Sequence, residues 1–170
     1  MSLEQHRAAA SHRALRFAVI TISDTRDAAS DRGGPFLVDG LVAAGHQVTF
    51  REIVKDDSEP IASSVQRAVS AVDVDLVLTT GGTGIAPRDV TVPTLEKLFE
   101  STIPGFGELF RMLSFRAIGS AAILSRATAG LIGGKVVIAL PGSPKALELA
   151  LGEIILKEAG HLVTQTRGPG

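Results

Sequence analysis

The sequence predicts an α/β sandwich of three layers, in which helices cover both faces of a mainly parallel, doubly wound sheet. Short runs of apolar and β-branched residues alternate along the chain with segments whose apolar residues recur at helical spacing. Loops rich in glycine, acidic or hydroxyl residues follow the ends of the apolar runs. This alternation favours parallel strands joined by right-handed crossover helices, with the strand-end loops along one edge of the sheet.

The predicted strands are short. Residues 16–22 (RFAVITI) and 75–80 (DLVLTT) are apolar enough for the centre of a parallel sheet. Residues 46–54 alternate in part, which is typical of a strand nearer an edge. Residues 135–141 (KVVIALP) form a further buried strand.

Helices are predicted between and after these strands. Residues 27–35 are loop-like, and the helix that follows ends at Gly45, a residue typical of a helix C-terminus. Thr91, with an early proline, indicates another helix start. The predicted helices span residues 36–45, 61–72, 91–100, 106–119 and 143–160.

The chain of 170 residues is long enough for one domain with a substantial core, and its apolar content of 45% is ordinary for a folded protein. We predict an N-terminal arm over residues 1–14, a single α/β domain over residues 15–163 and a C-terminal tail over residues 164–170.

The composition argues against several functions. The net charge of −1 and the absence of Trp and Tyr are unlike a nucleic-acid-binding surface. No apolar run approaches the roughly 20 residues of a membrane span, and residues 1–16 lack the apolar region of a signal peptide. The chain has no cysteine, so disulfides, zinc-thiolate sites and thiol nucleophiles are excluded. We therefore expect a cytoplasmic protein with neither nucleic acid nor membrane as its partner.

A glycine-rich loop, TTGGTGIAPRD over residues 79–89, follows the third predicted strand. Gly81, Gly82 and Gly84 let the backbone turn sharply and direct N–H groups at an anion, and Thr83 adds a hydroxyl. The spacing fits neither a P-loop nor the dinucleotide-binding glycine pattern. The pattern favours a phosphate cradle, and a tight turn without a ligand is the alternative.

Charged residues accompany this loop. Arg88 offers a cation for phosphate, and Asp89 offers a carboxylate for Mg²⁺ or a ligand hydroxyl. The alternative is that Arg88 is a solvated surface residue and that Asp89 caps the following helix. Asp56 and Asp57 follow the second predicted strand. They are either exposed turn residues or site residues at the same edge of the sheet.

Further polar candidates are Ser125, Arg126 and Ser143, which lie close to glycines or strand ends. All four histidines fall outside the candidate loops, so catalysis by a histidine base is not expected. The residues by themselves predict a binder of a phosphorylated ligand, with Mg²⁺ as a candidate cation, that works by electrostatic positioning.

Six motifs, in order, resemble the MoaB/Mog family of molybdenum cofactor biosynthesis proteins, which also includes the first domain of gephyrin. They are AVITISDTR, DRGGP, TTGGTGIAPRDVT, PGFGELFRMLSFRAIG, LSRATAG and ALPGSPKA. The FRMLSFRAIG segment is more similar to the MoaB branch. The resemblance implies a molybdopterin-binding α/β fold, assembled as a homotrimer or hexamer, and other cofactor biosynthesis proteins are candidate partners.

The resemblance also implies a reaction, the transfer of AMP from MgATP to the terminal phosphate of molybdopterin with release of pyrophosphate. Asp89 occupies the place of one acid that the family needs, and Asp56 best matches the second, with Asp57 adjacent; both would be catalytic and would contact Mg²⁺. ATP is then a co-substrate. The family's substrate-binding positions correspond here to Ser23, Asp24, Gly81, Gly82, Thr83, Gly84, Arg88, Ser125, Arg126, Pro141, Gly142 and Ser143.

Three other functions stay open at this point. A MoaB-branch protein can bind molybdopterin with little or no adenylating activity. Pyridine-nucleotide hydrolases of the competence-damage type share the fold, but they typically carry two acids where this chain has Arg88 and Asp89. A purely structural oligomer would not explain both charged residues beside the glycine loop.

Overall fold

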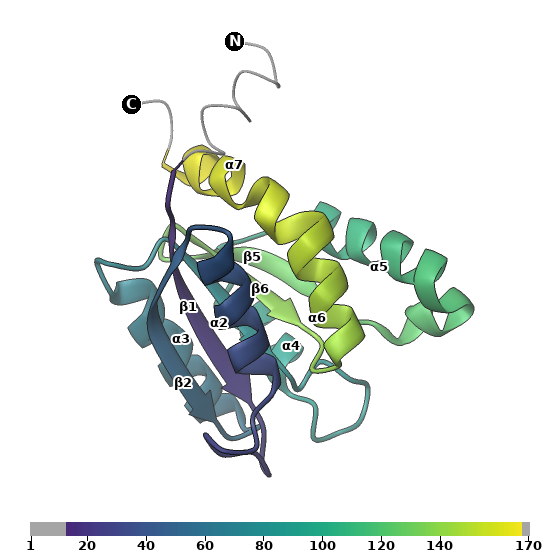
Figure 1. The fold of residues 1–170 in the computed structure, drawn as a ribbon. Helices are drawn as coiled ribbons and strands as arrows, with labels where there is room; N and C mark the ends of the chain where they lie inside the picture. Colours follow the sequence, from purple (N-terminus) through teal and green to yellow (C-terminus); the bar gives the residue numbers. More distant parts are fainter. Residues whose placement is uncertain (1–12, 168–170) are drawn as a thin grey trace.

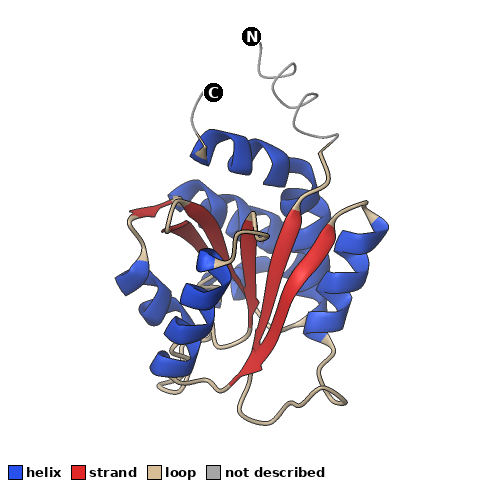
Figure 2. Ribbon diagram, turned by 90° about the vertical axis from the view of Figure 1, so that its left-hand side faces the viewer, coloured by secondary structure: helices blue, strands red, loops and turns tan. Residues whose placement is uncertain are grey.

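A computed structural model describes residues 13–167, and residues 1–12 and 168–170 lie outside the described part of the chain. The predicted N-terminal arm therefore falls almost entirely outside it. The described residues form a central sheet with helices on both faces, and Figure 2 shows these three layers. The predicted α/β class is confirmed.

Six strands build the sheet, and the predicted mainly parallel arrangement is confirmed. They are β1 (Arg16–Ile22), β2 (Gln47–Val54), β3 (Leu76–Thr80), β4 (Ser101–Thr102), β5 (Thr128–Ile132) and β6 (Lys135–Leu140). Their spatial order is β2-β1-β3-β6-β5-β4. The first four in this order are parallel, and β5 and β4 pair antiparallel at one edge. β2 lies at the other edge, as its alternating pattern predicts.

The antiparallel edge was not part of the predicted set of strands. β5 and β6 are joined by Gly133 and Gly134, whose φ angles of 58° and 72° are both positive. A Gly-Gly pair with positive φ angles matches the two-residue turn of a β-hairpin. This glycine pair between two apolar runs is the sequence signal that would have indicated β5.

Two apolar cores lie on the two faces of the sheet. Leu37, Phe110 and Leu147 belong to one core, and Ile61 and Leu95 belong to the other. The helices of the first face are α2 (Gly33–Ala43), α5 (Pro104–Ile118), α6 (Pro144–Ala150) and α7 (Leu156–Thr166), and those of the second are α3 (Ser58–Ser70) and α4 (Thr91–Leu98).

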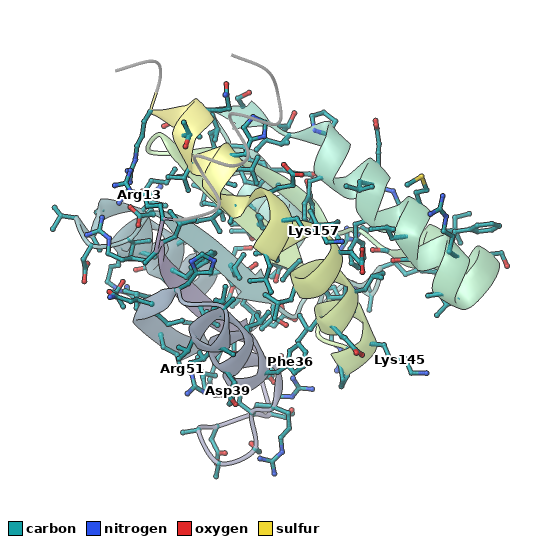
Figure 3. The ribbon with its side chains drawn as sticks, turned by 45° about the horizontal axis from the view of Figure 1, so that its top comes forward. Arg13, Phe36, Asp39, Arg51, Lys145 and Lys157 are labelled. Carbon is teal, nitrogen blue, oxygen red and sulfur yellow. The ribbon has the colours of Figure 1, made fainter. Side chains whose placement is uncertain are left out.

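Helix α2 begins at Gly33, inside the segment that was predicted to be a loop. The N–H of Gly34 donates to Asp31 Oδ1 at 3.1 Å, so this buried carboxylate caps the first turn. Leu37 is buried against the sheet, and Phe36 and Asp39 project outward from the same helix (Figure 3).

The C-terminal helix is longer than predicted. It runs from α6 through a π-helical segment, η2 (Leu151–Ile155), into α7 and ends at Thr166, beyond the predicted domain end at residue 163. Lys145 extends outward from its first turn (Figure 3). No helix among residues 13–167 has the length and hydropathy that crossing a bilayer requires.

An ion-pair cluster closes the amino end of the sheet. The Asp75 carboxylate accepts hydrogen bonds from Arg16 Nε at 3.1 Å and Nη2 at 2.9 Å, and from Arg167 near the end of α7. Burial acts to raise the pKa of Asp75, but the hydrogen bonds and charge of Arg16, with the bond from Arg167, outweigh it and lower this pKa to about 2. The cluster ties the last helix to β1 and β3.

Candidate functional site

The carboxyl ends of β1, β2, β3 and β6 meet at one edge of the sheet, where a cavity of about 520 Å³ opens. This is the edge at which open α/β sheets bind ligands, and the volume is in the range of small-molecule sites. The lining residues that the sequence predicted to be site residues are Ser23, Asp24, Asp56, Gly81, Gly82, Thr83, Gly84, Arg88, Asp89, Ser125, Pro141, Gly142 and Ser143. The fold thus brings these separate loops into one pocket.

The glycine loop approaches its neighbours too closely for side chains. Gly81 and Gly82 have φ angles of 106° and 63°, in the region that L-residues with side chains rarely adopt. A Cβ at Gly82 would lie 2.7 Å from Asp56 Oδ1 and would also meet the Thr91 hydroxyl. Glycine at this position therefore allows the loop to pass directly beside the Asp56 carboxylate.

The loop's carbonyls are held on the side of α4. The hydroxyl of Thr91 donates to the Gly81 carbonyl at 3.0 Å, and its N–H donates to the Gly82 carbonyl at 3.1 Å. Within residues 13–167, the N–H groups of Gly82, Thr83 and Gly84 donate to no protein acceptor. Unpaired donors in a glycine loop that lines a cavity are suited to an anion such as a phosphate.

Asp56 and Asp89 reach the pocket from neighbouring loops. Asp89 Oδ2 accepts a hydrogen bond from the N–H of Ala86 at 2.9 Å, which closes the tip of the glycine loop. The N–H of Asp56 donates to Asp24 Oδ1 at 3.0 Å, so the loops after β1 and β2 are joined as well. Three carboxylates therefore line one cavity.

This arrangement perturbs Asp56. Burial raises the pKa of the Asp56 carboxyl above its usual value, and the negative charges of Asp89 and Asp24 raise it further. The N–H of Val90 and the charge of Arg88 act in the opposite direction. A carboxyl group with a raised pKa in a cleft is typical of a functional site. A cation bound beside it would favour its ionised form.

Asp57 and Arg126 do not line this cavity. Asp57 is exposed and precedes the first residue of α3. The structure therefore separates the two adjacent acids, placing Asp56 in the pocket and Asp57 outside it. Arg126 lies behind the glycine loop and donates to its backbone carbonyls.

Ten residues that line the cavity were not predicted from the sequence to be site residues. The added residues come from the loop after β1, from α5, from the 3₁₀ helix η1 (Gly119–Leu124) and from other neighbouring segments. They are Ile22, Thr25, Arg26, Phe110, Ser114, Ile118, Ala121, Ala122, Leu124 and Ala146. Phe110 and Ser114 are four residues apart in the sequence, so helical periodicity could have placed both on one face. Nothing in the sequence marks η1 as a pocket wall.

The described histidines lie elsewhere. His46 packs against Phe17 with ring centroids 5.3 Å apart and accepts a hydrogen bond from the N–H of Leu15 at 3.2 Å. Neither His46 nor His161 lines the cavity, whereas His6 and His12 lie outside the described residues. Within residues 13–167, no group of three or more histidine or acidic side chains is placed to hold a metal ion.

The family follows from comparison with known proteins. The model of the family described as "Probable molybdopterin binding domain" matches residues 18–161. The chain belongs to this family. Molybdenum cofactor biosynthesis protein B of Bacillus cereus is 49% identical to it over 163 residues, which cover 95% of this chain and 96% of that protein.

Solved structures of the molybdopterin-binding family agree with this assignment. A crystal structure of a molybdenum cofactor biosynthesis protein B superposes with a TM-score of 0.90 at 48% identity, covering 92% of this chain and 98% of the other. The tungsten cofactor synthesizing protein MoaB from Pyrococcus furiosus superposes with a TM-score of 0.82 at 36% identity, covering 91% and 98%. The predicted resemblance to the MoaB/Mog family is confirmed.

Proposed function

We propose that this member of the molybdenum cofactor biosynthesis protein B family transfers AMP from MgATP to the terminal phosphate of molybdopterin. The products are adenylyl-molybdopterin and pyrophosphate. One observation carries the proposal: unpaired N–H groups of the glycine loop and the carboxylates of Asp56 and Asp89 line a single cavity. The first group suits phosphate, and the second suits the cation that accompanies ATP.

In the proposed reaction, an oxygen of the molybdopterin phosphate forms a bond to the α-phosphorus of ATP. The bond from that phosphorus to the bridging oxygen breaks, and its electron pair leaves with pyrophosphate. The attacking phosphate is anionic at neutral pH, so the protein needs to supply no general base. Its contribution is to align the two phosphates and to stabilise charge in the transition state.

Basic and polar groups of the pocket support this role. Arg26 and Arg88 line the cavity and would neutralise phosphate charge. The hydroxyl of Ser143 accepts from the N–H of Ala146 at 3.3 Å at the start of α6, and that of Ser125 accepts from the N–H of Ala127 at 3.4 Å. Both hydroxyls keep their own hydrogen available for a ligand oxygen.

Asp56 and Asp89 would hold Mg²⁺, because hard oxygen ligands suit this ion. Two carboxylates do not complete its coordination, and Mg²⁺ commonly takes its remaining ligands from substrate phosphates and water. When bound, the ion supplies neutralisation of charge on the reacting phosphates. The raised pKa of Asp56 fits such a group, since the cation favours its ionised form.

A second candidate is a protein that binds molybdopterin without turnover. The unpaired N–H groups of the glycine loop favour it, because they would bind a phosphate whether or not a reaction follows. Pyrophosphate release separates the two functions. The adenylyltransferase releases pyrophosphate from MgATP only when molybdopterin is added, whereas the binding protein retains molybdopterin and releases none in either case.

We also propose a homotrimer or hexamer, located in the cytoplasm, that passes its product to other cofactor biosynthesis proteins. Support comes from apolar side chains exposed along α5 and η1. They are Leu109, Met112, Phe115, Ile118 and Ile123, with exposed fractions of 37%, 47%, 61%, 54% and 83%. Apolar patches of this kind are typical of subunit contacts. Light scattering tests the assembly, and a monomer would contradict it.

A further inference from the structure

Arg126 has a role that its position in the sequence does not reveal. It lies half-buried between η1 and β5 and is not one of the residues that line the cavity. Its Nε donates to the Thr83 carbonyl at 3.3 Å, and its Nη2 donates to the carbonyls of Gly84 and, at 2.9 Å, of Asp89. A single guanidinium thus donates to three carbonyls of the glycine loop without itself lining the cavity.

These bonds determine which side of the loop presents its N–H groups. The described residues contain no cis peptide bond. In a trans peptide the carbonyl of one residue and the N–H of the next point in opposite directions. Because Arg126 holds the carbonyls of Thr83 and Gly84, the N–H groups of Gly84 and Ile85 face away from its guanidinium. Thr91 holds the carbonyls of the two preceding residues, so each carbonyl of residues 81–84 accepts a hydrogen bond from one of these two side chains or from the N–H of Thr91.

The third bond connects Arg126 to both aspartates. The carbonyl of Asp89 accepts from Arg126, and the N–H of the same peptide unit, which belongs to Val90, donates to Asp56 Oδ1 at 3.4 Å. One peptide plane therefore lies between the guanidinium and the Asp56 carboxylate. Loss of Arg126 would remove a restraint on the main chain of Asp89 and, through the same peptide unit, weaken the hydrogen bond between Val90 and Asp56.

We propose that Arg126 is a positioning residue that sets the anion-binding side of the glycine loop and the separation of Asp56 from Asp89. This inference rests on the proposed function for its catalytic consequence. The role assigned here differs from substrate binding by Arg126, because its bonds go to the protein's own carbonyls. A guanidinium is suited to this task, since its planar fork donates in several fixed directions.

Hydrogen–deuterium exchange tests this proposal without a substrate. The N–H groups of Ala86, Asp89, Val90 and Thr91 are all hydrogen-bonded within the loop region. In Arg126→Ala we expect their exchange to accelerate by at least about tenfold, because local opening becomes easier. Arg126→Lys keeps the charge but not the fork, and its exchange should also accelerate. If Arg126→Ala proves too unstable, Arg126→Lys decides the result.

Arg111→Ala is the matched control. Arg111 is also half-buried, donates to the Ala127 carbonyl at 3.4 Å and does not line the cavity. Exchange in residues 86–91 should match the wild type in this variant. Acceleration in Arg126→Ala alone supports the proposal. Equal acceleration in both variants, or none in either, overturns it.

Calorimetric titration with inorganic pyrophosphate adds a functional readout. Arg126→Ala should bind this probe more weakly, and added guanidinium chloride at low concentration should restore binding in Arg126→Ala only. Weaker binding with unchanged exchange would mean that Arg126 contacts the ligand directly, which contradicts the proposal. If the wild type does not bind pyrophosphate, the proposed function loses its support, and the exchange experiment still decides the role of Arg126.

Discussion

The N–H of Val90 donates to Asp56 Oδ1 at 3.4 Å, which joins the loop that carries Asp89 to the loop after β2. Asp24 accepts from the N–H of Asp56 at the same edge of the sheet. Each of the two proposed catalytic carboxylates thus accepts a hydrogen bond from a main-chain N–H, Asp56 from Val90 and Asp89 from Ala86. An asparagine side chain keeps an oxygen that can accept the same bond, so replacing either aspartate with asparagine should affect chemistry more than folding.

Asp56→Asn and Asp89→Asn should each reduce kcat for AMP transfer by about 100-fold or more, because each removes a charge proposed to hold the cation. Pyrophosphate release measures the effect. Asp57→Asn is the control, since Asp57 is exposed and outside the cavity, and it should retain activity close to the wild type. Comparable losses in Asp57→Asn and Asp56→Asn would contradict the assignment.

The pKa of Asp56 should fall when Asp89 is neutralised. Burial and the neighbouring negative charges raise the pKa of Asp56, so Asp89→Asn removes one of the causes and ionisation should then occur at lower pH. Carboxyl carbon chemical shifts measured across a pH titration report this directly. In the wild type, activity should be lost on the acidic side as Asp56 is protonated, above the ordinary Asp pKa of about 3.9.

Gly82→Ala should reduce both stability and activity. The new Cβ would sit at a φ angle of 63° and 2.7 Å from Asp56 Oδ1, and such strain costs roughly 1–3 kcal/mol. Gly45→Ala is the matched control, because its φ angle is 87° but no atom lies within 4 Å of its Cβ. Thermal unfolding should show destabilisation in both variants, and only Gly82→Ala should lose AMP transfer.

Asp75→Asn should destabilise the fold and leave the reaction intact. Asp75 lies at the amino end of β3, at the opposite end of the sheet from the cavity. Its folded pKa of about 2 is below the ordinary aspartate value of 3.8, so its ion pairs stabilise the protein above pH 3.8 and this stability is lost as the pH falls toward 2. The contribution is about 1–2 kcal/mol after screening of the exposed arginines.

Urea unfolding at pH 7 and at pH 2 to 3 measures this contribution. The wild type should lose its advantage over Asp75→Asn at the acidic end. A constant difference between the two proteins across the whole pH range would show that the pKa of Asp75 is not depressed. Activity of Asp75→Asn at pH 7 confirms that the site is unaffected.

Much of the fold could be predicted from the sequence because its strands are continuous apolar runs. Strands β1, β3 and β6 are buried along all or almost all of their length, which is expected for continuous apolar runs in the centre of a parallel sheet. β5 escaped prediction because its sequence, TAGLI, is short and contains glycine. The start of α2 at Gly33 depends on a cap from Asp31, a buried contact that composition did not indicate.

The cavity-lining residues that could be predicted from the sequence are polar and glycine residues in loops that follow strands. Those whose position depends on tertiary packing could not be predicted. Asp56 and Asp57 could not be separated from sequence alone, because both follow β2; the backbone directs only Asp56 into the cavity. The wall formed by Phe110, Ser114 and Leu124 depends on how α5 and η1 pack beside the glycine loop. Arg126 was expected in the pocket, and only side-chain geometry places its guanidinium behind the loop.

The most direct test is mass spectrometry of the wild-type protein incubated anaerobically with molybdopterin and MgATP, alongside Asp89→Asn and a reaction without protein. We predict that adenylyl-molybdopterin accumulates with the wild type alone, with one pyrophosphate released for each molecule formed. Molybdopterin that stays bound and unmodified in the presence of MgATP would contradict adenylyl transfer and identify the chain as a binding protein.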